Sequence, residues 1–258
     1  MSEPGYALVT GASSGIGECF ARALAKRGHN LALAARTKAK LEGLAKELRS
    51  QNSVSAEAIE IDLSASGAAE RLFKILQERR IAIDLLVNNA GFGARGRFWE
   101  LPLDRQAQMI RLNVVALFEL THLLLPPMVA QRRGAIINVS STAGFQPVAY
   151  TSAYAASKAF VTSFSEGLAE ELRGSGVTVV TLCPGGTRTN FFVASNYGRP
   201  KLPGGMQDPE AVVKAALRAL ARGGGLVVPG TMNKLGLISQ RVVPRSVVKR
   251  LTAKMFRL

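Results

Sequence analysis

Residues 6–17 read YALVTGASSGIG, and this stretch decides the fold. A short apolar run at 6–10 leads directly into a glycine-rich turn, and a helix-period segment at 16–27 follows. Glycines let a backbone turn sharply and approach a phosphate closely, while a helix N-terminus offers free N–H groups and a positive dipole end. In a strand–turn–helix unit this pattern predicts a turn that binds the pyrophosphate of a dinucleotide. The expected contacts are Gly11, Ser13, Ser14, Gly15, Ile16 and Gly17.

Short β-rich apolar runs alternate with longer helical segments along the chain. We expect strands at 6–10, 31–35, 56–61, 85–88, 135–139, 178–183 and 226–228. Helical periodicity marks 16–27, 38–49, 68–79 and 103–125, and Asp208-Pro209-Glu210 predicts the start of a helix that ends near Arg222. The pattern predicts an α/β fold, a doubly wound (Rossmann-like) parallel sheet of seven strands with helices on both faces. All 258 residues are expected to form one domain, with 194–205 as a mobile substrate loop because it holds three Gly and two Pro.

The end of the second expected strand indicates which dinucleotide binds. Residues 34–38 read AARTK, with no carboxylate to accept the ribose hydroxyls of NAD. Arg36 can instead pair with a 2′-phosphate, so NADP(H) is the expected cofactor. Asp62, after the third strand, fits a contact to adenine and an ordinary turn residue equally well.

Residues 154–158 read YAASK and open a predicted helix that runs to about residue 173. A spacing of four residues places Tyr154 and Lys158 on one helix face. An ammonium ~4 Å from a phenol contributes on the order of 4 kcal/mol at an effective dielectric of 20, which would bring the phenol pKa near neutrality. A phenol tuned in this way can donate a proton to a carbonyl oxygen as hydride arrives, or accept one in the oxidative direction.

These motifs together resemble the short-chain dehydrogenase/reductase family over about residues 6–192. The motifs are the 10–17 turn, Asn88-Asn89-Ala90-Gly91, Asn113, Ser140-Ser141, Tyr154-Ala155-Ala156-Ser157-Lys158, and Pro184-Gly185. The resemblance implies an NADP-preferring oxidoreductase acting on CH–OH and C=O groups. It implies that Ser141, thirteen residues before the tyrosine, orients the substrate carbonyl, and that Lys158 holds the nicotinamide ribose. It also implies a water-linked proton relay maintained by Asn113.

The same resemblance implies further cofactor contacts and an oligomeric assembly. The resemblance implies that Asn89, Ala90 and Gly91 line the cofactor cleft, and that the chain forms a homodimer or homotetramer through the two long helices carrying Asn113 and Tyr154. The segment after the sixth strand lies where ligands bind in open α/β sheets. Its expected contacts are Pro184, Gly185 and, for the nicotinamide carboxamide, Thr187 or Thr189.

The composition and the termini indicate in which compartment the protein is expected and which kinds of ligand and partner are not expected. Two cysteines without metal-type spacing, and histidines without a ligand-spaced partner, predict no disulfide framework and no metal site. The N-terminal residues lack a signal pattern, and no uninterrupted apolar run approaches the roughly 20 residues of a membrane span. We therefore expect a cytoplasmic protein. No nucleic-acid recognition element is visible beside the charge.

The net charge of +15 is concentrated near the C-terminus, where residues 199–258 carry twelve basic and two acidic side chains. Residues 234–258 form a basic amphipathic tail, in which residues 245–258 place apolar side chains on one helical arc and cations on the rest. Such a helix docks on its own or a neighbouring subunit, the reading we favour, or lies on an anionic membrane surface.

The substrate is expected to be a small hydrophobic carbonyl or alcohol. Apolar residues 191–193 follow the Pro-Gly motif and suit an acyl thioester, a steroid-like ketone or a lipid aldehyde. Arg95 and Arg97 fit either an anionic substrate group or loop solvation. Phe92, Phe98 and Trp99 fit a substrate mouth or a cover for the sheet edge, and core packing is the interpretation that we favour. Two non-enzymatic alternatives are an NADP(H)-sensing interaction protein without turnover and a peripheral membrane scaffold that uses the tail.

Overall fold

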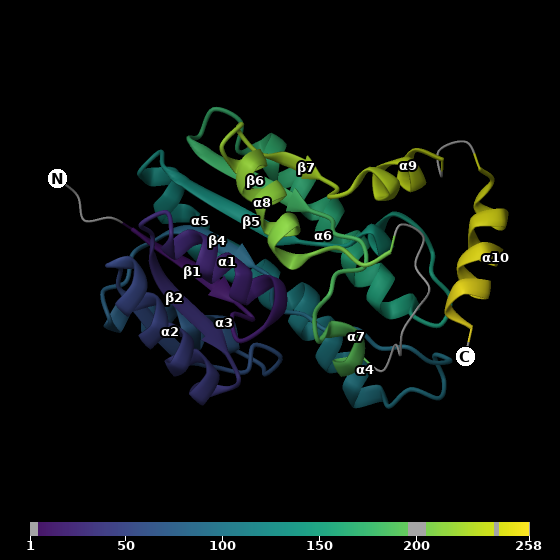
Figure 1. The fold of residues 1–258 in the computed structure, drawn as a ribbon, viewed down its shortest axis with the longest axis horizontal. Helices are drawn as coiled ribbons and strands as arrows, with labels where there is room; N and C mark the ends of the chain where they lie inside the picture. Colours follow the sequence, from purple (N-terminus) through teal and green to yellow (C-terminus); the bar gives the residue numbers. More distant parts are fainter. Residues whose placement is uncertain (1–4, 196–204, 240–242, 258) are drawn as a thin grey trace.

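The computed structural model describes residues 5–195, 205–239 and 243–257. Its centre is a parallel sheet of seven strands in the order β3-β2-β1-β4-β5-β6-β7, with helices on both faces (Figure 1). The strands are β1 (Tyr6–Thr10), β2 (Asn30–Ala35), β3 (Ala56–Glu60), β4 (Ile83–Asn88), β5 (Gly134–Val139), β6 (Val177–Leu182) and β7 (Gly225–Val227). The predicted fold class is confirmed, and each strand lies within two residues of its predicted start. The order reverses between β1 and β4, and this switch point opens a crevice at the carboxyl ends of the strands.

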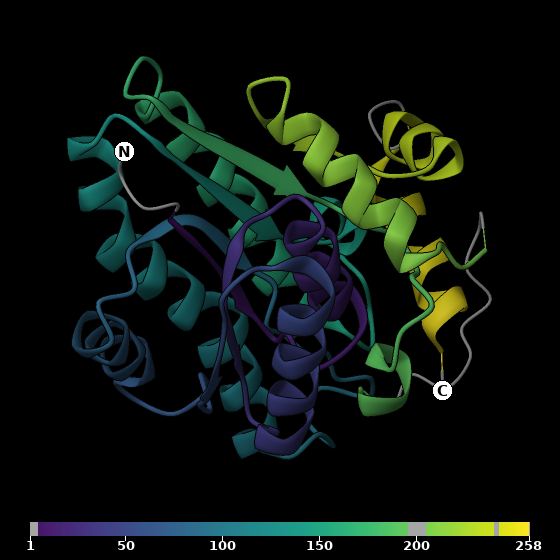
Figure 2. The ribbon, with the colours of Figure 1, turned by 60° about the vertical axis from the view of Figure 1, so that its left-hand side comes forward.

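Two layers of helices cover the sheet because its strands are apolar on both faces. On one face, a continuous core joins the strands to α1 (Gly15–Ala25), α2 (Lys38–Asn52) and α8 (Pro209–Leu220). On the other, α3 (Ala68–Glu78), α5 (Leu117–Ala130) and α6 (Ser152–Glu171) complete a second core (Figure 2). The predicted start of α8 is confirmed, since the Asp208 carboxylate accepts a hydrogen bond from Glu210 N at 3.0 Å.

The long helical run after β4 differs from its prediction. It consists of α4 (Leu103–Ile110), a π-helix η1 (Arg111–Ala116) and α5, which continues through Pro126 and Pro127 to Ala130. By length and composition alone, the run Leu103–Ala130 could also cross a membrane. The sequence analysis did not predict this, because polar residues interrupt the run. In this fold Leu117, Leu120 and Leu124 are buried in the second core, as in a helix that covers a sheet.

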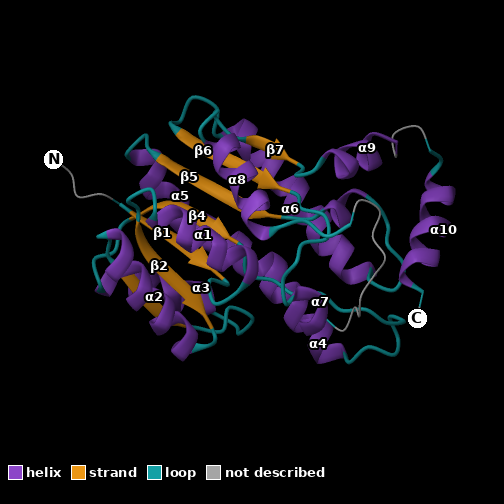
Figure 3. Ribbon diagram, in the orientation of Figure 1, coloured by secondary structure: helices purple, strands orange, loops and turns teal. Residues whose placement is uncertain are grey.

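Three further helices lie beyond the carboxyl ends of the strands. They are α7 (Phe191–Ala194), α9 (Thr231–Ser239) and α10 (Arg245–Phe256). The strand arrowheads in Figure 3 are directed toward this group. The prediction of a loop from residue 194 is wrong at its start, because Ala194 is helical and the buried Ser195 hydroxyl accepts a hydrogen bond from Gly93 N at 2.9 Å. Residues 196–204 of that predicted loop lie outside the described residues.

The C-terminal tail docks on its own subunit, as the favoured interpretation held. Val248 and Thr252 of α10 are buried, and the Thr252 hydroxyl donates to Pro147 O at 3.1 Å. Arg95 donates from Nε to Phe256 O at 3.1 Å and from Nη2 to Arg257 O at 2.6 Å, so it holds the last carbonyls of the helix. Arg95 therefore has a structural task that its sequence context did not indicate.

Candidate active site

The glycine-rich turn joins β1 to α1 at the carboxyl edge of the sheet. Gly11 and Gly15 have φ values of 66° and 58°, which favour glycine because other residues are strained there. A Cβ on Gly17 would collide with Gly11 O and the Asn89 side chain. The N-cap residue Ser14 makes no side-chain cap hydrogen bond, which leaves the first N–H groups of α1 to a ligand. The turn thus has the space and the dipole that a pyrophosphate requires.

A polar clamp fixes this turn against β4. The Asn89 amide donates to Thr10 O at 2.9 Å and to Gly11 O at 3.3 Å. The Thr10 hydroxyl accepts from Asn89 N and Ala90 N, both at 3.0 Å. Asn89 therefore lines the cleft, and its amide also holds the turn. The part played by Thr10 was missed in the sequence because a threonine ending a strand carries no distinctive pattern.

Arg36 and Asp62 both line the pocket, just beyond the carboxyl ends of β2 and β3, and lie close enough to interact electrostatically. Asp62 Oδ1 accepts from Ser64 N at 2.9 Å and from Ser64 Oγ at 2.7 Å. Burial raises the pKa of Asp62, but these hydrogen bonds and the positive charge of Arg36 outweigh it, and the pKa is lowered. Both sequence interpretations of Asp62 are thus compatible with its position, since it closes a turn and lines the pocket.

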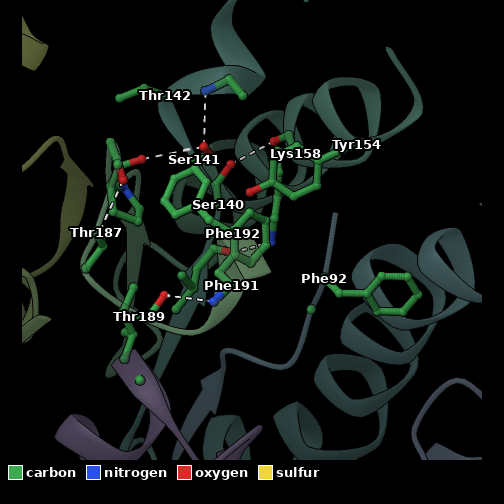
Figure 4. Close-up of a pocket in the computed structure, with 18 of the residues that line it drawn as sticks. Phe92, Ser140, Ser141, Thr142, Tyr154, Lys158, Thr187, Thr189, Phe191 and Phe192 are labelled. Atoms are coloured by element: carbon green, nitrogen blue, oxygen red, sulfur yellow. Dashed lines mark hydrogen bonds between the residues drawn. The ribbon is translucent and has the colours of Figure 1, made fainter. Parts of the chain in front are cut away.

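Tyr154 and Lys158 occupy the first turns of α6 and are both buried (Figure 4). The Lys158 ammonium donates to Val139 O at 2.8 Å and lies 6.0 Å from the centroid of the Tyr154 ring. Burial lowers the pKa of Lys158 to about 8. The lysine is therefore predominantly protonated at neutral pH, which places a positive charge beside the phenol.

The two serines after β5 have different surroundings. The Ser140 hydroxyl is buried, donates to Lys158 O at 2.8 Å and lies 2.7 Å from the Thr162 hydroxyl. Ser141 caps the short 3-10 helix η2 (Thr142–Phe145) by accepting from Ala143 N at 3.1 Å, and its own contact to Pro184 O is long, at 3.5 Å. Ser140 is thus occupied in fixing α6, whereas the Ser141 hydroxyl lines the cavity and donates at a longer distance, to Pro184 O.

Asn113 lies behind the pocket, within the π-helix. Its amide donates to Phe92 O at 3.0 Å and to Ser157 Oγ at 3.1 Å, and its carbonyl accepts from Phe92 N at 3.1 Å. The side chain therefore ties the segment after β4 to α6. π-Helical turns are frequent at functional sites, but the sequence carried no signal for this one. The proton relay implied for Asn113 stays a prediction.

The segment after β6 closes the pocket over the glycine-rich turn. Thr189 lies against Gly15, where an added Cβ would come within 3.0 Å of the threonine methyl group. The Thr187 hydroxyl donates to Gly185 O at 3.1 Å. Pro184 and Gly185 line the same wall.

These elements enclose one cavity of about 630 Å³. All the predicted site residues line it except Gly17, which lies under the turn, and Asn113. Beyond Tyr154 the lining becomes apolar. It includes Phe192, which belongs to the run expected to suit a hydrophobic substrate, and residues that the sequence did not assign to a site: Met232, Leu237, Val248, Leu251, Met255 and Phe256. The amphipathic arc of the tail was visible in the sequence, but the surface that it covers was not.

Two aromatic residues near this region were predicted wrongly. Phe98 and Trp99 are 62% and 78% exposed, so they are not core residues. The Arg97 guanidinium pairs with Glu100 at 3.0 Å and lies 5.9 Å from the Trp99 ring centroid. Arg97 is thus engaged on the surface of its own loop, which corresponds to the solvation alternative. The described residues include no group of three or more His, Cys, Asp or Glu side chains arranged to hold a metal ion.

Comparison with known proteins identifies the family. The sequence model of the family described as short chain dehydrogenase matches residues 5–199. This chain belongs to the short-chain dehydrogenase family. The dehydrogenase is therefore an oxidoreductase that uses a nicotinamide dinucleotide.

Two curated relatives and one solved structure indicate the range of similar proteins. The dehydrogenase is 33% identical to the human very-long-chain 3-oxoacyl-CoA reductase, over 89% of its own length and 74% of the relative's. It is 34% identical to ketoacyl reductase HetN of Nostoc sp. (strain PCC 7120), over 83% and 74% of the two chains. A short-chain dehydrogenase from Sphingobium yanoikuyae in complex with NADPH superposes with a TM-score of 0.82 at 35% identity, covering 92% of this chain and 94% of that one.

Proposed function

We propose that this dehydrogenase is an NADPH-dependent reductase that transfers hydride between the nicotinamide and a carbonyl or alcohol of a hydrophobic substrate. The observation that carries the proposal is one continuous cavity. It joins the glycine-rich turn and Arg36 at one end to Tyr154 and Lys158 in the middle, and these to an apolar chamber at the other end. A dinucleotide and an apolar substrate would meet beside the phenol.

The residues at the dinucleotide end fit NADPH. Arg36 lines the pocket at the adenosine end, where its charge suits a 2′-phosphate. Gly11, Gly15 and the open N-terminus of α1 leave room and N–H donors for the pyrophosphate. Gly91 lines the pocket between Asn113 and Lys158, and a Cβ there would come within 2.9 Å of Asn113 Oδ1. The NADPH complex of the Sphingobium relative supports this preference.

The bound cofactor supplies hydride in reduction and accepts it in oxidation. In reduction, the Tyr154 phenol donates its proton to the carbonyl oxygen, and the Ser141 hydroxyl donates a hydrogen bond to the same oxygen. The buried Lys158 ammonium stabilises the resulting phenolate and binds the ribose hydroxyls. Asn113 acts as a positioning residue, because it holds α6 and the segment at Phe92 in register.

The apolar chamber favours a 3-oxoacyl thioester among the expected substrates. Apolar residues of α10 and α7 line the same cavity, namely Leu251, Met255, Phe256, Phe191 and Phe192. This chamber suits an acyl chain, and an elongated apolar cavity gains free energy with each buried methylene, by about 0.8 kcal/mol. The names of the human and Nostoc relatives both refer to ketoacyl reduction. A steroid-like ketone and a lipid aldehyde are the other candidates.

We also propose a homodimer or homotetramer built on the helices that carry Asn113 and Tyr154. Phe118 of α5 and Phe160 of α6 are 47% and 40% exposed, and both rings contact Phe164. Exposed aromatic residues that meet across two helices are typical of a subunit interface. We propose in addition that the enzyme is cytoplasmic. Its two cysteines are free, which is consistent with a reducing compartment.

The test of the function is NADPH oxidation followed at 340 nm with ketones, aldehydes and 3-oxoacyl thioesters of increasing chain length. Tyr154→Phe is expected to lower kcat by about 10²- to 10⁴-fold while NADPH binding, measured by fluorescence, is retained. Tyr6→Phe, which removes a hydroxyl from β1 away from the pocket, is the matched control. Tight NADPH binding without turnover on any substrate would refute the reductase and support the NADP(H)-sensing alternative.

A further inference from the structure

One side of the molecule combines exposed apolar side chains with positive charge. We call it the mouth surface: the exposed sides of α9 and α10 together with residues 97–103. In Figure 1, α10 runs down the right-hand side and α9 lies toward its upper, N-terminal end, while the bonds of Arg95 to Phe256 and Arg257 bring the 97–103 segment to the C-terminal end of α10. Its exposed large apolar residues are Phe98, Trp99, Leu103, Met232, Leu235, Ile238, Val247, Leu251 and Met255. This set holds most of the exposed large apolar side chains among the described residues.

The charge of α9 and α10 has one sign, whereas the 97–103 segment holds one ion pair, Arg97 with Glu100, and adds no net charge. Residues 223–258 contain seven Lys and Arg side chains and no Asp or Glu. Lys249, Arg250 and Lys254 are exposed on α10. Among residues 5–195, 205–239 and 243–257, no ion pair involves α9 or α10. The α10 cations therefore face solvent without a neutralising carboxylate.

The active-site cavity opens within the same surface. Met232 of α9 and Leu251 and Met255 of α10 line the cavity, and they are also 58%, 56% and 37% exposed. Side chains that border both the cavity and solvent mark its entrance. An apolar substrate would therefore reach Tyr154 by passing between these two basic helices.

The positive charge distinguishes between the two partners that such a surface could bind, a second copy of this chain and a lipid bilayer. A second copy of this chain would meet it, in a two-fold contact, with the same patch, and like charges would then face one another. Apolar and cationic side chains mixed on one helix surface are instead the composition of elements that lie in the headgroup region of an anionic bilayer. The exposed Trp99 is of the type that is enriched at membrane–water interfaces.

We propose that the mouth surface docks on an anionic lipid bilayer, with the cavity entrance directed at the lipid, so that the enzyme takes its apolar carbonyl substrate from the membrane. This inference rests on the proposed function for the identity of the substrate, but not for the docking itself. It assigns α10 two tasks. Val248 and Thr252 seal the cavity from within, while the cations and apolar residues on the outer side of the helix contact the lipid.

The experiment is sedimentation of the full chain with vesicles of phosphatidylcholine alone or with 30% phosphatidylglycerol. Binding is expected only to the anionic vesicles and is expected to fall as salt increases. The triple variant Lys249→Gln/Arg250→Gln/Lys254→Gln is expected to bind roughly 100-fold more weakly, at about fivefold per cation. Lys26→Gln/Lys46→Gln/Lys74→Gln removes the same charge from α1–α3 and is expected to bind as the wild type does.

Further measurements test whether apolar side chains insert into the lipid, and whether the partner is instead an acidic protein. They also distinguish a failure of the docking from a failure of the proposed reaction. Leu235→Asn/Ile238→Asn changes apolar residues that do not line the cavity, and we expect it to weaken vesicle binding at least tenfold. Equal losses of vesicle binding in both triple variants, or no binding to anionic vesicles at low salt, would overturn the docking. Capture of an acidic protein without vesicle binding would do the same. Tyr154→Phe is expected to bind vesicles normally, so a failure of turnover alone would count against the reductase and not against the docking.

Discussion

Replacing Lys158 by methionine is expected to stabilise the cofactor-free enzyme while abolishing its activity. Methionine has a similar length and no charge to desolvate. Burial lowers the pKa of Lys158 from 10.5 to about 8, a shift of about 2.5 units that at 1.36 kcal/mol per unit corresponds to about 3 kcal/mol. Losing the bond to Val139 O costs about 1 kcal/mol. The variant should therefore be more stable than the wild type by about 2 kcal/mol at pH 7.

The stability difference between the wild type and Lys158→Met is expected to depend on pH, because the folded and unfolded chains release the Lys158 proton at different pH values. Between pH 8 and 10.5 the unfolded chain holds a proton on Lys158 that the folded chain has released, so the wild type gains stability as pH rises through this window. Below pH 8 both states are protonated and the full penalty is present. The stability advantage of Lys158→Met should accordingly fall by most of this ~3 kcal/mol penalty between pH 7 and pH 10.

Urea unfolding of both proteins at several pH values, without cofactor, measures this difference. Taking the difference between the two proteins cancels the titration of the other groups. Lys46→Met, at an exposed position of α2, is the control and should show no such pH dependence. If Lys158→Met is less stable at pH 7, and the gap does not change up to pH 10, then burial does not lower the lysine pKa and the electrostatic account of the site is wrong.

Three other predictions concern the turn, the cofactor and the assembly. Gly17→Ala places a methyl group against the backbone and is expected to weaken NADPH binding, measured by calorimetry, at least 100-fold. Its control is Gly43→Ala, where a Cβ meets nothing within 4 Å. This variant should bind NADPH normally and gain about 0.5–1 kcal/mol of folding stability. Arg36→Ala is expected to lower kcat/KM for NADPH by 10- to 100-fold and leave that for NADH nearly unchanged, and an equal loss with both would exclude a 2′-phosphate contact. Phe160→Asp should shift the sedimentation coefficient to that of the monomer, and an unchanged coefficient would place the subunit interface elsewhere.

The fold was predictable because its signals are local. A glycine turn between a strand and a helix, and apolar runs short enough to be strands, require only neighbouring residues to be interpreted. The helix after β4 was predicted to stop before Pro126, yet it continues through both prolines to Ala130. Local rules end a helix at proline, whereas here packing of the apolar side chains against the sheet maintains it.

The sequence by itself determined the fold class, the family and the residue types at the reaction centre, because each depends on motifs with fixed spacing. Tertiary structure decided what those residues can do. It buried Lys158 and thereby lowered its pKa, and it used the Ser140 hydroxyl to fix α6 while it placed Ser141 in the wall of the cavity. It also folded α10 back over the cavity, so that one helix provides both the substrate wall and the basic outer surface. Burial and long-range contact depend on how distant segments pack, and no local pattern encodes that.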